Sequence, residues 1–402
     1  MSLFKTLRTG LLISLWFVFL TFPLVVIKVD PLERIIHWRW ENAVMMAIGS
    51  FLVFLLVQFI NYRKAHRPIT AGANPKGMVE LFGTFIADPR RRAILLAVLL
   101  VIAVIFPFKV STYQTNIMIT ALMYVVLGLG LNIVVGMAGL LDLGFVAFYA
   151  VGAYSYALLN YHLGIGFWAA LPIGGALAAM AGILLGFPVL RLRGDYLAIV
   201  TLGFGEIIRL VLENWGEVTH GPSGISNIPR PGLFGLELSL NTSILYLYFI
   251  MIAFVIFTIF VVNRLQNSRL GRAWIALRED EIACQAMGID KQKTKLAAFA
   301  LGAFWAGLMG VVFAAKTTFI NPASFTFLES AIILSIVVLG GMGSIVGVII
   351  GAMILILLPE YLRALSEFRM LAFGAILVAM MVFRPQGLIA NVRRSYTFKK
   401  TG

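Results

Sequence analysis

The chain has 402 residues, of which 60% are hydrophobic and only 12% are charged, and its formal net charge is +14. A soluble domain carries about 25% charged residues, so this composition excludes an ordinary soluble enzyme or nucleic-acid-binding domain and predicts an all-α polytopic membrane protein. The single cysteine, Cys284, excludes an internal disulfide and a cysteine-based metal site, and the four histidines form no ligand pattern.

Three apolar runs come before residue 110, at 11–27, 43–60 and 93–107. Their lengths suit helices that cross about 30 Å of hydrocarbon at 1.5 Å per residue. No small-residue cleavage site follows the first run, so we expect it to remain as a transmembrane helix rather than to act as a signal peptide. The sequence therefore predicts an N-terminal hydrophobic extension over 1–110 with about three transmembrane helices.

The rest of the apolar sequence lies within 111–390. Membrane spans are expected at 117–135, 143–159, 167–190, 196–212, 243–262, 297–315 and 370–383. Residues 330–359 are also free of charge, but this run is too long for one ordinary span. The cluster from Gly340 to Ser344 divides it, so either two short spans or a re-entrant pair fits the pattern.

The basic segments predict which loops face the cytoplasm. They are the N-terminus, 61–92, 191–195, 263–296 and the tail over 391–402. Placing all of them on the cytoplasmic side satisfies the positive-inside rule and requires an even number of crossings. The sequence therefore predicts roughly ten to twelve transmembrane helices with both termini in the cytoplasm.

The sequence contains none of the common catalytic or nucleotide-binding motifs. The chain contains no P-loop, no nucleophile elbow, no His-Glu-x-x-His and no Gly-x-Gly-x-x-Gly. We therefore expect no enzyme activity and no cofactor in this chain. If ATP drives its function, another chain must hydrolyse the nucleotide.

A few residues inside the apolar runs are candidates for a translocation pathway. Gly128, Gly130 and Gly136 surround Asn132 and would loosen a helix at mid-depth, as discontinuous helices do in transporters. Gly341 and Gly343 interrupt the later charge-free run in the same way.

Charged residues within spans are rare and form a second set of candidates. Glu206 and Arg209 are three residues apart and can pair on one helix face. They either line the pathway or form a plain intrahelical pair near the membrane interface. Asp142 and Glu329 precede apolar runs and are expected to cap helices.

The most polar segment of the central region is 263–295, which carries seven Lys or Arg and four acidic residues. Trp274, Leu277 and Ile282 recur at roughly helical spacing, which predicts a short amphipathic helix that ends near Gly288. Such a helix suits the groove of a cytosolic partner. The alternative is a solvated connector.

Five stretches resemble the family of branched-chain amino acid ABC permeases. They are LRGDYLAIVTLGFGEIIRL at 192–210, LNIVVGMAGLLDLGFVAFYAVGAYSYALL at 131–159, GRAWIALREDEIACQAMGID at 271–290, VVLGGMGSIVGVIIGA at 337–352 and RPQGL at 384–388. Asp142 in the second stretch and the hydrophobic N-terminal extension are similar to the M-type subunits of this family.

This resemblance implies a permease subunit that moves leucine, isoleucine and valine across the bacterial inner membrane. Its partners would be a second, H-type permease, two cytosolic ATPase subunits, a periplasmic amino-acid-binding protein and the lipid bilayer, with no nucleic acid. Loop 263–295 would then couple the chain to the ATPases, because Glu281, Ala283 and Gly288 loosely match the family's Glu-Ala-Ala…Gly motif. The residues expected to couple are Trp274, Leu277, Arg278, Glu279, Asp280, Glu281, Ala283 and Gly288.

Two alternatives share parts of this pattern. A urea or short-amide permease of the same family would carry every motif. A secondary transporter or channel would not need the basic loop, and it should show more buried carboxylates for ion coupling.

Overall fold

The computed structural model divides the chain into two compact units, Met1–Arg92 and Ala93–Gly402. It describes residues 100–189, 194–232 and 239–361, with short pieces at 27–30, 35–38, 40–41, 44–49, 51, 192, 374, 378, 382 and 387–389. The predicted spans at 11–27, 43–60, 93–107 and 370–383 and the basic tail lie wholly or mostly outside the described residues.

In the first unit two short strands form an antiparallel hairpin. Strand β1 (Ile27–Asp30) pairs with β2 (Ile35–Trp38), with Ile27 opposite Trp38 and Asp30 opposite Ile35. This hairpin is a small exception to the predicted all-α architecture. Residues 44–49 are helical, in agreement with the start of the predicted second span.

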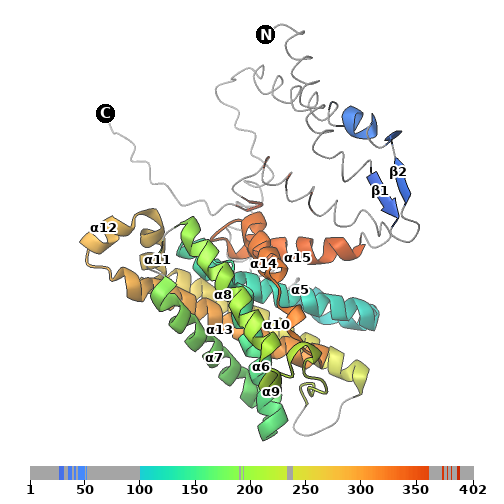
Figure 1. Ribbon diagram of the computed structural model, residues 1–402. Helices are drawn as coiled ribbons and strands as arrows, with labels where there is room; N and C mark the ends of the chain where they lie inside the picture. Colours follow the sequence, from blue (N-terminus) through green and yellow to red (C-terminus); the bar gives the residue numbers. More distant parts are fainter. Residues whose placement is uncertain are drawn as a thin grey trace. The chain divides into compact units, whose positions relative to one another are not determined.

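The second unit is helical, and its elements follow the predicted apolar runs (Figure 1). After an apolar helix at Leu100–Lys109, the elements are α5 (Thr112–Leu131), the π-helix η1 (Asn132–Met137), α6 (Phe145–Leu163), α7 (Phe167–Val189), α8 (Asp195–Asn214), α9 (Gly216–Thr219), the 3₁₀ turn η2 (Gly221–Ser223), α10 (Leu240–Gln266), α11 (Arg269–Glu279), α12 (Glu281–Ala286), α13 (Lys291–Thr317), the 3₁₀ turn η3 (Pro322–Ser324), α14 (Phe327–Gly340) and α15 (Ile345–Tyr361).

Helix α13 lies at the centre of this unit and packs against α5, α6 and α7. Small residues make this packing possible, because a Cβ added to Gly152 of α6 would lie only 2.1 Å from the carbonyl oxygen of Gly307. Close approach of helix backbones at small residues is the usual way in which helices associate in lipid. The glycines of α13 therefore act mainly in packing.

The glycine cluster divides the charge-free run as predicted. Helix α14 ends at Gly340 and α15 begins at Ile345, and the two helices touch where Gly340 and Gly347 face one another. Helix α14 has 14 residues, or about 21 Å, which is shorter than the hydrocarbon layer. Whether the pair crosses the membrane twice or re-enters it stays a prediction.

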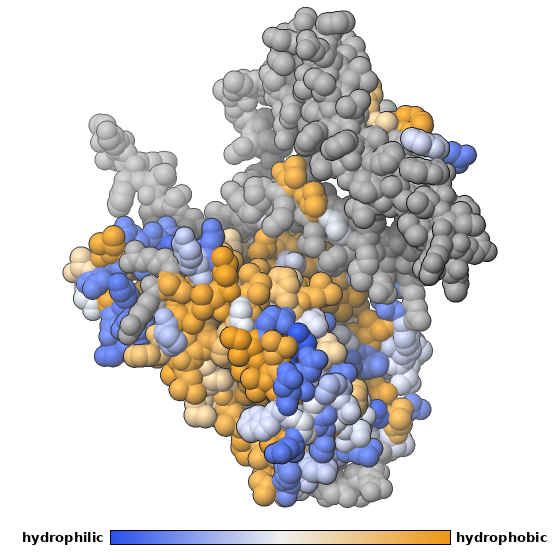
Figure 2. Space-filling view, viewed as in Figure 1, coloured by the Kyte–Doolittle hydropathy of each residue, from blue (hydrophilic) through white to orange (hydrophobic). Residues whose placement is uncertain are grey.

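The described helices are those of a multi-pass membrane protein. Five of them are long and apolar enough to span a bilayer: Thr112–Met137, Phe167–Val189, Leu240–Gln266, Lys291–Thr317 and Pro322–Gly340. Figure 2 shows an apolar surface over α7 and α8, with hydrophilic residues of α11 and α12 at one end and hydrophilic residues around α9 at the other. An apolar band between two polar ends is the surface that a bilayer requires.

Candidate coupling and translocation site

The helical run that begins with α5 changes its winding at Asn132. From there to Met137 the backbone forms a π-helix, and it then turns at Gly139, whose φ is +71°. Three β-branched residues in a row, Ile133 to Val135, have low helix propensity, and π-helical turns are frequent at functional sites. The structure thus confirms the predicted irregularity, which begins at Asn132.

Asn132 joins this break to the glycine cluster between α14 and α15. Its side chain is fully buried, and its Oδ1 accepts a hydrogen bond of 2.8 Å from the backbone N–H of Gly343. Gly136 makes room for this contact, because a Cβ there would lie 1.9 Å from Asn132 Oδ1 and 2.5 Å from Gly343 N. Three predicted pathway residues, far apart in the sequence, therefore meet.

The polar loop at 263–295 reaches the same place through Arg278. Its guanidinium donates a 2.6 Å hydrogen bond to the carbonyl oxygen of Gly136, and its aliphatic part lies against Gly139. Gln266, the last residue of α10, donates from Nε2 to the carbonyl oxygen of Gly343 at 3.3 Å. We call Asn132, Gly136, Gln266, Arg278 and Gly343 the helix-break cluster.

The glycine cluster has a second neighbour in the C-terminal segment. The backbone N–H of Leu388 donates to Leu339 O at 2.8 Å, and a Cβ on Gly387 would lie 2.5 Å from Gly341 Cα. Gly341 itself has a φ of +113°. Gly387 and Leu388 of the RPQGL stretch therefore pack beside Gly341 and Leu339, which links two of the motifs recognised in the sequence.

The loop itself differs from the predicted single amphipathic helix. It forms two helices, α11 and α12, which are broken at Asp280. Asp280 caps α12, because its Oδ1 accepts hydrogen bonds from the N–H groups of Ile282 (2.8 Å) and Ala283 (3.0 Å). The bonds from Ala283 and Ile282 hold the pKa of the Asp280 carboxyl below its ordinary value. Gly288 follows the end of α12 with a φ of +83°, as predicted for a helix stop.

The predicted apolar row is wrong for its first two members. Trp274 and Leu277 are 0% and 2% exposed, and Trp274 donates from its ring to Thr294 O at 2.8 Å. Both side chains therefore hold α11 to the chain's own core and cannot lie in the groove of a partner. Of this row only Ile282, which is 69% exposed, remains free, and Met287, which follows the last residue of α12, is 83% exposed.

The charged residues of the loop also divide between inward and outward positions. Glu281 forms an ion pair with Lys295, which is buried at the start of α13. Glu279 and Ala283 are exposed. The surface open to a partner is thus carried by α12 and the end of α11.

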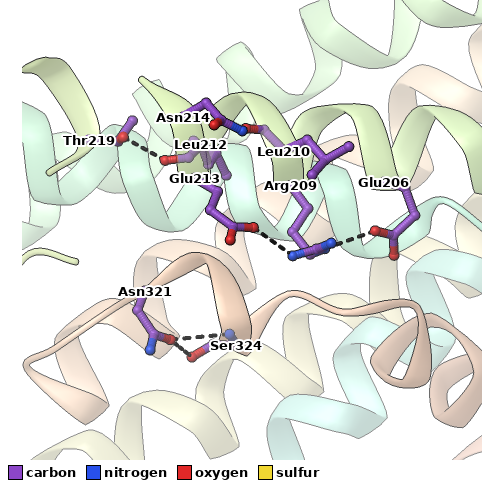
Figure 3. A network of polar contacts seen from close by, with 9 residues as sticks. All are labelled: Glu206, Arg209, Leu210, Leu212, Glu213, Asn214, Thr219, Asn321 and Ser324. Carbon is purple, nitrogen blue, oxygen red and sulfur yellow. Dashed lines mark hydrogen bonds and ion pairs between the residues drawn. The ribbon is translucent and has the colours of Figure 1, made fainter. Parts of the chain in front are cut away.

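The second set of pathway candidates lies elsewhere, on α8 (Figure 3). Arg209 pairs with Glu206 and also with Glu213, each at 2.8 Å, and the three side chains are partly exposed. Figure 3 shows this row beside Asn321 and Ser324, and α8 indeed packs against η3. The predicted pair is confirmed as a contact, and its role stays a prediction.

Two expected caps are wrong. The N-cap of α6 is Gly144, and Asp142 lies two residues earlier, where its Oδ1 accepts from Gly144 N–H at 2.9 Å. Glu329 lies in the first turn of α14 without capping it, and its carboxylate accepts a hydrogen bond from the Tyr124 hydroxyl. Tyr124 was not among the predicted site residues, although its spacing from other polar residues of α5 was visible in the sequence.

These features define a multi-pass membrane protein of the transporter type, in which a broken helix is tied to a polar loop. The model of the family described as branched-chain amino acid transport system / permease component matches residues 113–384. This chain belongs to that family.

The relatives agree with this assignment. The LivM permease proteins of the high-affinity branched-chain amino acid transport systems of Salmonella typhimurium and Escherichia coli are 46% and 45% identical to the chain, each over 90% of it and 88% of the relative. The autoinducer 2 import system permease protein LsrC of Escherichia coli is 26% identical over 56% of the chain and 67% of LsrC. No solved structure matches the chain.

Proposed function

We propose that this chain is the transmembrane permease subunit of an ATP-driven importer that carries leucine, isoleucine and valine across the bacterial inner membrane. Its family and the names of its LivM relatives support the substrate class. The observation that carries the mechanism is the hydrogen bond from Arg278 to Gly136. It links the segment open to cytosolic partners directly to the break in the membrane helix.

The importer would contain an H-type permease, two cytosolic ATPases and a periplasmic amino-acid-binding protein. The sequence holds no nucleotide-binding motif, so the ATPase activity belongs to other chains. Helix α12 offers Ile282 and Met287 to such a partner, with the charged Glu279 and Asp280 beside them. Exposed apolar anchors with a charged rim are what a helix needs to dock in a groove.

Movement of the ATPases would reach the pathway in three steps. Helix α12 moves with the ATPases, and α11 follows because only Asp280 separates the two helices. Arg278 then pulls on the Gly136 carbonyl and changes the winding of η1. Since Asn132 holds Gly343, the same movement shifts the turn between α14 and α15.

Replacement of Arg278 tests this mechanism. Losing a charge-assisted hydrogen bond of about 1.5–3 kcal/mol should lower uptake per ATP hydrolysed about tenfold or more in Arg278→Ala. The measurement is leucine uptake and ATPase activity of the complete complex in proteoliposomes. Arg272→Ala is the matched control, because Arg272 lies on the same helix and, among the described residues, its side chain bonds only to Asn267 in its own loop. Equal coupling in both variants would contradict the mechanism.

The proposed topology has ten to twelve spans with both termini in the cytoplasm. A cysteine at exposed Glu217 and another at exposed Ile282, each in a Cys284→Ser background, should label from opposite sides of the membrane. Ile225, a neighbour of Glu217 in the same loop, is buried and unsuitable. Labelling of both cysteines from the periplasm would overturn the topology.

The same reconstituted complex separates the alternatives. A urea or short-amide permease would take up urea and leave leucine outside. A secondary transporter would continue to accumulate its substrate after the ATPases are removed.

A further inference from the structure

The first half of α5 carries a row of polar residues on one face. Tyr113, Asn116, Thr120 and Tyr124 are spaced by three and four residues, so they lie one above the other. From Ile119 to Leu131, Thr120 and Tyr124 are the only residues of α5 that are not buried. We call these four residues the polar stripe. A polar stripe is unusual in a membrane span, and the side chains of this one are not buried.

Three charged side chains from other helices contact this stripe. Glu360 of α15 accepts a hydrogen bond from the Tyr113 hydroxyl, and the oppositely charged Lys316 and Glu329 lie further along the stripe. Lys316, in the last turn of α13, donates to the Thr120 hydroxyl, and Glu329 of α14 accepts from the Tyr124 hydroxyl. In the part of the chain that the structure describes, neither of them forms an ion pair. Charged residues in membrane spans almost always pair or mark a substrate pathway.

The spacing of the two charges suits a small zwitterion. Thr120 contacts Lys316 and Tyr124 contacts Glu329. These two residues are one turn apart on α5, so their positions along the helix axis are separated by about 6 Å. All four side chains are partly exposed, so a ligand can reach them. A ligand with its own carboxylate and ammonium group would neutralise both charges at once.

An aromatic cluster adjoins these charges. The ring of Tyr149 lies 5.3 Å from that of Phe313 and 5.5 Å from that of Phe325, measured between centroids. Phe313 is one turn before Lys316 on α13, and Phe325 is four residues before Glu329 in the sequence. Tyr149 and Phe325 are buried and Phe313 is partly exposed, so Phe313 is the ring of this cluster that an aliphatic side chain can contact.

We propose that Lys316 and Glu329 form a binding subsite for an aliphatic α-amino acid along the translocation pathway. Lys316 holds the carboxylate, Glu329 holds the ammonium group, and Phe313, backed by the buried Tyr149 and Phe325, contacts the branched side chain. The subsite rests on the proposed function, because it needs an amino acid to pass along α5.

Substrate protection tests the subsite directly. Asn116 lies on the stripe one turn before Thr120 and is exposed. In a complex with Asn116→Cys and Cys284→Ser, leucine at millimolar concentration should slow maleimide labelling about tenfold. The probes 4-methylpentanoate, which lacks the ammonium group, and 3-methylbutylamine, which lacks the carboxylate, should protect far less.

Charge removal supplies the second measurement. Lys316→Met and Glu329→Gln should each abolish leucine protection and lower uptake about tenfold to a hundredfold. Lys316→Arg, which keeps the charge, should retain most of both. Glu217→Gln removes an exposed charge elsewhere and should change neither.

The outcomes separate the subsite from the proposed function. Leucine protection that persists in both Lys316→Met and Glu329→Gln would overturn the subsite. So would the absence of protection in a complex that takes up leucine normally, and this result does not depend on any charge variant folding. A complete complex that takes up no leucine at all would instead overturn the proposed function.

Discussion

The two ends of the α5–η1 segment satisfy their polar groups in different ways. At the end that contains η1, the helix-break cluster bonds to backbone groups, because the buried Asn132 accepts from the Gly343 N–H and the exposed Arg278 donates to the Gly136 carbonyl. At the other end, the polar stripe bonds through side-chain hydroxyls to charged residues that stay accessible. Side chains that bond to backbone groups move with the helices that carry them, which suits the transmission of movement, whereas accessible charged side chains suit the binding of a ligand. The proposed mechanism and the proposed subsite thus place coupling and substrate contact at opposite ends of one segment.

The largest expected effect follows from Gly136→Ala. The new Cβ would occupy the space of Asn132 Oδ1 and Gly343 N, and overpacking of this kind costs about 1–3 kcal/mol or more. We expect uptake to be almost lost and the yield of assembled complex to fall. Gly203→Ala on α8 is the control, because a Cβ there meets nothing within 4 Å. Normal uptake by Gly136→Ala would show that the helix-break cluster is loose.

A second prediction compares a substitution in α11 with one in α12. Leu277→Asp would bury an unpaired carboxylate, which costs several kcal/mol, so we expect little folded permease. Ile282→Asp changes an exposed residue and should leave the permease folded while it weakens binding of the ATPases. Permease yield and the ATPase-to-permease ratio on one gel measure both effects. Equal yields would contradict the inward packing of α11.

A third prediction compares the two ends of the segment through single hydrogen bonds. Asn132→Ala leaves the buried Gly343 N–H without its acceptor, which should cost about 1–3 kcal/mol and lower the melting temperature of the complex. Thr120→Val removes the hydroxyl that accepts a hydrogen bond from Lys316. Water can reach Lys316 and replace this acceptor, so the melting temperature should barely change. A larger drop for Thr120→Val would reverse the comparison.

The smallest effect is expected at Asp280. Asp280→Asn keeps an acceptor for the N–H groups of Ile282 and Ala283 and should behave like the natural protein, whereas Asp280→Ala should fray α12. Because the folded-state pKa of Asp280 is lowered, its contribution is present above the ordinary carboxyl pKa and is lost as pH falls through the lowered value. Amide hydrogen exchange at Ile282 and Ala283 measures this, and equal exchange in the two variants would exclude the cap.

Much of the architecture followed from patterns that act over short distances. The apolar runs predicted α5, α6, α7, α8, α10 and α13, because a helix in lipid must satisfy its own backbone groups whatever surrounds it. The glycines from Gly340 to Gly343 predicted the break between α14 and α15. Asn132 and Gly136 were identified as a loosened point of a helix, although their bond to Gly343 was not foreseen.

Local patterns therefore predicted the set of helices, the interruption points, the family and the position of the polar loop. The direction in which that loop faces depends on the folded contacts, because an amphipathic helix has the same periodicity whether its apolar side packs on its own chain or on a partner. Trp274 and Leu277 turned out to face inward for this reason. The contacts of Arg278 with Gly136 and of Tyr124 with Glu329 join residues 142 and 205 positions apart, and no local pattern constrains such pairs.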